Sequence, residues 1–103
     1  AGAGVKSWIL DPGFGFAKNP QENLTLLSGL SGLKTSYHGY EPRILVGISR
    51  KSMIYRTLEI TPEESLPATQ ALHMCALMNG ADILRVHDVR EAKQVSILYN
   101  HMA

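Results

Sequence analysis

Hydrophobic positions along the chain fall into three short apolar runs, each followed by polar residues and a helical pattern. The first run, WIL, leads to Asp11; the second covers residues 44–48 and the third covers residues 83–86. Continuous apolar runs of this length are typical of strands covered on both faces in a parallel sheet. We therefore predict three parallel strands joined by right-handed helical connections.

The first connection carries a strong helix start. In Asn19-Pro20-Gln21-Glu22, Asn19 has the residue type of an N-cap, Pro20 suits the first helical position, and Glu22 can return a capping contact. An apolar helical stripe follows, formed by Leu24, Leu27 and Leu30, with Gly32 near its end.

The later connections repeat this pattern. Thr61-Pro62-Glu63-Glu64 is a second capping sequence, and Pro67 predicts that the main helix begins there and runs to Gly80. Its predicted core positions are Leu72, Cys75, Ala76 and Met78. Asp88 is expected to cap a last helix. The packing residues predicted for that helix are Val89, Ala92, Val95, Ile97 and Leu98.

Three strand and helix units cannot close a sheet on themselves, because an edge strand and apolar surface stay uncovered. The runs are spaced by roughly 35 to 40 residues, as in a barrel of eight such units with about 250 residues. We therefore predict an α/β fold that forms the last three strand–helix units of a (β/α)₈ TIM barrel, with a parallel sheet and an incomplete barrel in this chain.

The composition and net charge of the chain restrict the classes of molecule that we expect it to bind. The chain has 103 residues, and 10 lysines and arginines against 9 acidic residues give a net charge of +1, so we expect neither nucleic acid nor a membrane surface as a partner. The N-terminal AGAGVK lacks a secretory pattern, which predicts a cytoplasmic location. Cys75 is the single cysteine and is expected to pack as a small hydrophobe. The histidines His38, His73 and His101 lack metal-ligand spacing, so we predict no metal ligand here and read them as surface or packing residues.

Polar residues gather at the carboxyl end of each predicted strand. Because side chains alternate along a strand, one face receives Ile9 and Asp11, then Leu45, Gly47, Ser49 and Lys51 if that strand stays extended, then Ile83, Arg85 and His87. The opposite face is purely apolar and suits covering by helices. Enzymes with barrels and open α/β sheets place their sites at this end of the strands.

Each candidate has a functional and a structural interpretation. Asp11 can accept hydrogen bonds from a ligand edge with adjacent N–H groups, or it can cap its own turn. Arg85 and His87 suit an anion clamp, or one of them pairs with Asp88. Lys51 reaches a site, or forms a solvated pair with its neighbour in the sequence, Arg50.

The glycine-rich segment DPGFGF leaves a further choice open. Phe14 and Phe16 are either loop hydrophobes or walls for an aromatic ligand. GFGF is not a dinucleotide fingerprint, because it lacks the third glycine and an acidic residue about 20 positions later.

Three segments in this order, ILDPGFGFAKNPQENLTLL, ILVGISRKS and ADILRVHDV, resemble the C-terminal part of dihydropteroate synthases. The resemblance covers nearly the whole chain and identifies residues 1–103 as the C-terminal part of a pterin-binding domain. It implies a transferase of folate biosynthesis that joins 4-aminobenzoate to 6-hydroxymethyl-7,8-dihydropterin diphosphate and releases diphosphate. Sulfonamides compete for the aminobenzoate position, Mg²⁺ assists, and family members form homodimers.

The resemblance also implies residue roles. Asp11 holds the N–H edge of the pterin, Gly47 lies under it, and Lys51 reaches the pterin and the reacting region. Phe16 and Ser52 shape the aminobenzoate pocket. Arg85 and His87 anchor the diphosphate, and Lys51, Arg85 and His87 are the expected catalytic residues.

The chain departs from the family pattern at Ala68 and Asn19, where glycine and threonine are common; neither is an expected ligand residue. The family's first half, with its metal-binding asparagine, is absent, so we expect the Mg²⁺ ligand there and no synthase activity from this chain alone. Two alternatives stay open. One is a pterin-binding domain of a methyltransferase, which has no diphosphate to clamp, and the other is a non-catalytic fragment that self-associates.

Overall fold

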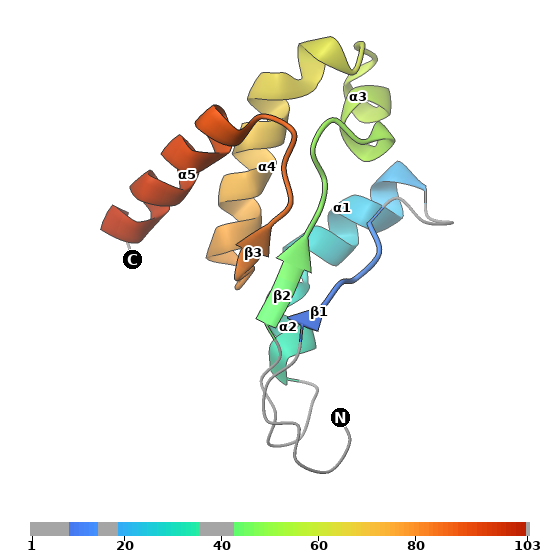
Figure 1. Cartoon of the computed structure of the whole chain (residues 1–103). Helices are drawn as coiled ribbons and strands as arrows, with labels where there is room; N and C mark the ends of the chain where they lie inside the picture. The colour runs from blue at the N-terminus through green and yellow to red at the C-terminus, as the bar shows by residue number, and fades with distance from the viewer. Residues whose placement is uncertain (1–8, 15–18, 36–42, 103) are drawn as a thin grey trace.

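The computed structural model describes residues 9–14, 19–35 and 43–102. Three parallel strands form its sheet in the order β1 (Ile9–Leu10), β2 (Arg43–Val46) and β3 (Ile83–Leu84), as Figure 1 shows. Ile9 pairs with Arg43, and Leu45 pairs with Ile83. The predicted parallel α/β arrangement is confirmed. The strands are shorter than the apolar runs, because the chain leaves the sheet before residues 48 and 86.

The helices follow the strands in the predicted alternation. They are α1 (Pro20–Ser28), α2 (Leu30–Thr35), α3 (Ser52–Leu58), the 3₁₀ helix η1 (Glu63–Ser65), α4 (Leu66–Met78) and α5 (Val89–Met102). In Figure 1, α1, α2 and α4 lie behind the sheet. Helix α5 packs on α4, and α1 packs on α3 and α4. No helix in the part of the chain that the structure describes is long and apolar enough to cross a membrane.

Both predicted capping sequences form. The Glu22 N–H donates to Asn19 Oδ1 at 2.8 Å, and the Asn19 N–H donates to Glu22 Oε1 at 3.0 Å, which satisfies two backbone donors at the start of α1. Thr61 and Glu64 make the same reciprocal pair, at 3.3 and 3.0 Å, ahead of η1. Helix α4 then begins one residue before Pro67.

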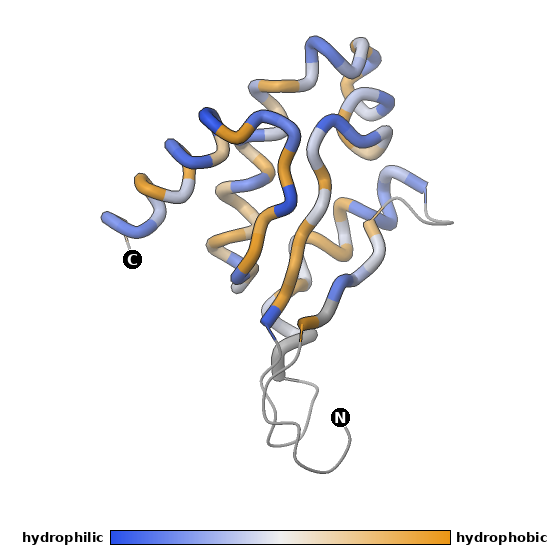
Figure 2. Tube along the Cα trace, in the orientation of Figure 1, coloured by the Kyte–Doolittle hydropathy of each residue, from blue (hydrophilic) through white to orange (hydrophobic). Residues whose placement is uncertain are grey.

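One face of the sheet carries the core. Ile44, Val46 and Ile48 have no exposed surface, and Phe14 and Leu27 are 1% exposed. On the other face Ile9 is 56% exposed. Figure 2 shows the hydrophobic colour along β2 and the hydrophilic colour where the chain enters α3. The described helices therefore cover only one face, whereas the apolar runs predicted cover on both.

Three details of the predicted helices are wrong. No helix was expected at residues 52–58, because α3 lacks a capping sequence: its N-cap, Lys51, makes no side-chain cap bond. Met78 is 64% exposed, since the buried stripe of α4 is Thr69, His73, Ala76 and Leu77. On α5 only Ala92 is buried, although this helix contacts α4; Val89, Ile97 and Leu98 are exposed. Cys75 packs against the core as expected.

Candidate functional site

The guanidinium of Arg85 lies directly against the backbone of Gly47 on the neighbouring strand end. A Cβ built on Gly47 would stand 2.7 Å from Arg85 Nη2 and 3.0 Å from Nε. The Arg85 N–H also donates to the Val46 carbonyl at 2.9 Å, which continues the parallel pairing beyond β3. Only glycine leaves room for this close approach. Gly47 and Arg85 thus share a side, as the alternation predicted.

Lys51 connects the loop after β2 with the loop after β1. Its Nζ donates to the carbonyl oxygen of Phe14 at 2.7 Å. The pKa of Lys51 is lowered, first by burial and then by the charge of Arg85, while the Asp11 carboxylate acts in the opposite direction. The three charged groups predicted from three separate strand ends therefore lie near one another, at the carboxyl end of the sheet.

Asp11 caps the turn that follows β1. Its Oδ1 accepts the Gly13 N–H at 2.9 Å, and Gly13 has a φ of 74°, a conformation that favours glycine. The Asp11 residue stays exposed at the surface even though its side chain caps this turn. Phe14, 1% exposed, is a core residue and not a ligand wall. Phe16 lies outside the described residues.

Ser49 and His87 also meet at the carboxyl end of the strands, which we call the rim of the sheet. The His87 N–H donates to Ser49 Oγ at 3.3 Å, and the His87 residue is exposed. Ser49 is 7% exposed and also lies 3.4 Å from Nε2 of His73 in α4. Because β2 ends at Val46, the alternation does not extend to Ser49, which contacts the helix layer. That placement corrects the predicted open-face position of Ser49.

Arg50 and Asp88 form an ion pair at this rim. Arg50 Nε lies 2.9 Å from Asp88 Oδ2, and Nη2 lies 2.7 Å from Oδ1. The hydrogen bond with Arg50 is the first cause that lowers the pKa of Asp88. Asp88 therefore pairs with Arg50 rather than with Arg85 or His87. Arg50 and Lys51 do not form a solvated pair, because Lys51 donates to the Phe14 carbonyl instead.

Ser52 completes the predicted set. It is the half-buried first residue of α3, directly after Lys51. Beneath this rim lie the buried Thr69 and His73 and the half-buried Gln70; packing was one of the two interpretations predicted for His73, and the other two residues were not predicted. Their spacing on one helix was the available signal, although nothing in the sequence linked them to Ser49.

Among residues 9–14, 19–35 and 43–102, no group of three or more His, Cys, Asp or Glu is arranged to hold a metal ion.

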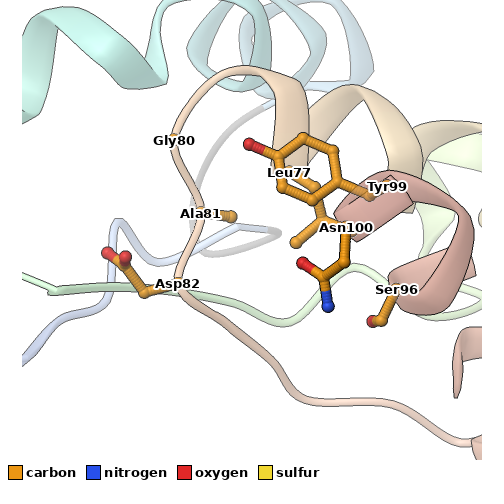
Figure 3. A pocket seen from close by; sticks show the side chains of 7 residues that line it. All are labelled: Leu77, Gly80, Ala81, Asp82, Ser96, Tyr99 and Asn100. Atoms are coloured by element: carbon orange, nitrogen blue, oxygen red, sulfur yellow. The ribbon is translucent and has the colours of Figure 1, made fainter. Parts of the chain in front are cut away.

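A separate cavity of about 330 Å³ opens at the opposite end of β3 (Figure 3). Its lining includes Asp82, Tyr99 and Asn100, with Asp82 just ahead of the strand. Asp82 Oδ2 accepts the Ile44 N–H at 2.9 Å, which ties β3 to β2. In barrel folds this end of the strands contributes stability rather than chemistry.

A one-sided parallel sheet whose carboxyl ends bring together a carboxylate, an ammonium and a guanidinium is the arrangement of an α/β enzyme that binds a polar ligand at its rim. The family model described as "Pterin binding enzyme" matches residues 1–87, and the chain belongs to that family.

Relatives agree with this assignment. The chain is similar to the dihydropteroate synthase of Escherichia coli K12, with 45% identity over 91 residues that cover 88% of this chain and 31% of the relative. It resembles the crystal structure of the Yersinia pestis dihydropteroate synthase, with a TM-score of 0.84, 40% identity, and coverage of 91% of this chain and 42% of that one. A Yersinia pestis structure with a pterin–sulfa conjugate matches with a TM-score of 0.83 and 41% identity, over 91% of this chain and 36% of the other. The chain thus spans about a third of the length of its E. coli relative.

Proposed function

We propose that residues 1–103 form the C-terminal part of a dihydropteroate synthase domain, the last three strand–helix units of a (β/α)₈ barrel. The half-covered sheet supports this: Ile9 is exposed, and Leu45 and Ile83 are half-buried, on the face that would point into a barrel. The similarity to two Yersinia pestis synthase structures over 91% of the chain points the same way.

The complete protein, in this proposal, condenses 4-aminobenzoate with 6-hydroxymethyl-7,8-dihydropterin diphosphate to give 7,8-dihydropteroate and diphosphate. The observation that carries it is the meeting of Asp11, Lys51 and Arg85 at one rim, where Arg85 lies against Gly47. A carboxylate beside two cations fits a ligand with an N–H edge and an anionic tail.

Each side chain then has a role. Asp11 accepts hydrogen bonds from the N–H groups at the edge of the pterin, and Arg85 and His87 bind the diphosphate. As the bond between the pterin methylene carbon and the diphosphate oxygen breaks, its electron pair leaves with the diphosphate. The amine of aminobenzoate forms the new bond to the carbon and loses one N–H proton to water. Fixed cations at Arg85 and Lys51 stabilise the charge that develops. Phe16 and Ser52 are proposed to border the aminobenzoate.

Other partners belong to the same proposal. Sulfonamides are expected at the aminobenzoate position, and the pterin–sulfa conjugate in a Yersinia pestis relative supports this. Among the described residues no group of three or more His, Cys, Asp or Glu is arranged to hold a metal ion, and we propose that the Mg²⁺ ligand lies outside residues 1–103. A cytoplasmic location stays a prediction from the sequence.

Turnover by the complete protein tests the activity. With the dihydropterin diphosphate and 4-aminobenzoate, we expect equimolar dihydropteroate and diphosphate, and we expect none from the 103-residue chain alone. Methyl transfer from a pterin without diphosphate release would favour the methyltransferase alternative instead. Dihydropteroate formation by the isolated chain would contradict the proposal that the remaining barrel is needed.

Self-association is a second candidate property, because large hydrophobic residues are exposed on two helices. Large hydrophobic residues are exposed on α4 and α5, namely Met78, Val89, Ile97, Leu98 and Met102. We propose that further protein covers this surface, either the rest of the chain or a second copy in a homodimer. Sedimentation of the complete protein as a compact monomer would exclude the homodimer.

A further inference from the structure

A line of buried polar groups runs from α4 to the rim. Gln70 Oε1 lies 3.0 Å from His73 Nδ1, His73 Nε2 lies 3.4 Å from Ser49 Oγ, and Ser49 Oγ accepts the His87 N–H at 3.3 Å. His73 has no exposed surface and Ser49 is 7% exposed. A buried imidazole in the middle of such a line needs a physical reason, since polar groups lose hydration on burial.

The hydrogen-bond partners of His73 determine which ring nitrogen carries the proton. The Gln70 Oε1 atom can only accept, so His73 Nδ1 carries the ring proton and donates to it. In the neutral ring Nε2 is then an acceptor, so the Ser49 hydroxyl, which also accepts the His87 N–H, donates to Nε2. The ring is neutral in this arrangement, and burial, which lowers the pKa of His73 against the opposing charge of Asp88, acts in the same direction.

A second bond from the same helix supports the neighbouring loop. Thr69 Oγ1, also without exposed surface, accepts the Arg50 N–H at 3.2 Å. Arg50 has a φ of 53°, which is uncommon for a residue with a side chain, and it holds Asp88 through two hydrogen bonds. Thus α4 contacts both the loop that carries Lys51 and, through Ser49, the loop that carries His87.

We propose that His73 is a positioning residue: it fixes the Ser49 hydroxyl, which in turn fixes the backbone of His87 at the diphosphate end of the site. The inference rests on the proposed function for the role of His87. Without the Nε2 acceptor, the Ser49 hydroxyl is free to turn, and the His87 segment loses a fixed anchor. The Asp11 end of the site shares none of these bonds.

Four variants of the complete protein test this. His73→Ala and His73→Leu remove the acceptor, and Leu keeps the apolar volume. His73→Gln places an amide oxygen near the position of Nε2, whereas His73→Asn reaches only the position of Nδ1. We expect the KM for the dihydropterin diphosphate to rise about tenfold in Ala, Leu and Asn, the loss of about one buried hydrogen bond, and to stay within about threefold in Gln. The KM for 4-aminobenzoate should not change.

Hydrogen exchange of the His87 amide is measured in the same proteins without substrate. We expect protection to fall in His73→Leu and in Ser49→Ala, and to return in His73→Gln. Unchanged protection and unchanged KM in His73→Leu would overturn the inference, as would equal losses in Gln and Leu. A wild-type protein without turnover would instead overturn the proposed function, and the amide measurement would still decide whether His73 holds this loop.

Discussion

Arg50 holds Asp88 through two parallel hydrogen bonds, of 2.9 and 2.7 Å, and so joins the loop after β2 to the start of α5. The two residues lie 38 positions apart in the sequence. Lys51 follows Arg50 and His87 precedes Asp88, so this pair keeps two predicted ligand-binding residues at a fixed separation. The planar guanidinium of arginine can make both hydrogen bonds to the carboxylate at once, whereas a lysine ammonium lacks this geometry.

The Arg50–Asp88 pair should give the protein a stability that depends on acid pH. Arg50 lowers the pKa of Asp88 below its ordinary value of 3.8 in the folded state. The contribution is therefore fully present above that ordinary value and is lost as the pH falls through the lower, folded value. The unfolding free energies of wild type and Asp88→Asn, measured in urea, should differ at pH 6, and the difference should shrink as the pH falls below 3.8.

The matched control removes the partner. In an Arg50→Met background, Asp88→Asn should no longer produce that difference between pH 6 and the acid range, since the cation that lowers the pKa is gone. An equal pH-dependent difference with and without Arg50 would mean that another group holds the carboxylate.

Gly47→Ala should weaken diphosphate binding while the fold persists. The new Cβ would meet Nη2 of Arg85 at 2.7 Å, and the end of a long side chain can move at little cost to the core. We expect a KM for the dihydropterin diphosphate raised by about tenfold, the scale of one charged hydrogen bond, with an unchanged melting temperature. Gly32→Ala is the control, because nothing lies within 4 Å of a Cβ there. Equal kinetics in the two variants would argue against the Arg85 contact.

Alkaline pH should weaken binding of pteroate through Lys51. Burial and Arg85 lower the pKa of this ammonium from its ordinary 10.5, so its charge is lost at a lower pH than that of an exposed lysine. Affinity, measured by titration calorimetry, should fall as pH rises toward 10. Lys51→Arg should not show this fall, because arginine keeps its proton up to a pH of about 12. Lys93→Arg, at an exposed position on α5, should behave as wild type.

Asn19→Ala should destabilise the protein by about 1 kcal/mol, because the Glu22 N–H at the start of α1 loses its acceptor, Asn19 Oδ1. Asn19→Asp keeps the acceptor and should lie within about half of that loss. Chemical denaturation measures both. Unfolding free energies that do not separate Ala from Asp would show that the cap contributes little to this helix.

Much of the fold was predictable because its signals are local. The capping pairs at Asn19 and Thr61 depend on residues three apart, and the alternation along β2 placed Ile44, Val46 and Ile48 in the core. Helix α3 was missed because it has no capping side chain, so the packing of Met53 and Ile54 rather than local sequence sustains it. The exposure of Leu98 could not be foreseen, since an apolar pattern does not say which neighbours are present.

By itself the sequence determined the three strands, the capped helices, the family, and the charged residues that end each strand, because these depend on periodicity and on short motifs. Tertiary structure alone decided the partners. It paired Asp88 with Arg50, turned Ser49 toward His73, and set Arg85 against Gly47. Such contacts join residues that are 24 to 38 positions apart, and their geometry depends on where each strand leaves the sheet, which no local pattern specifies.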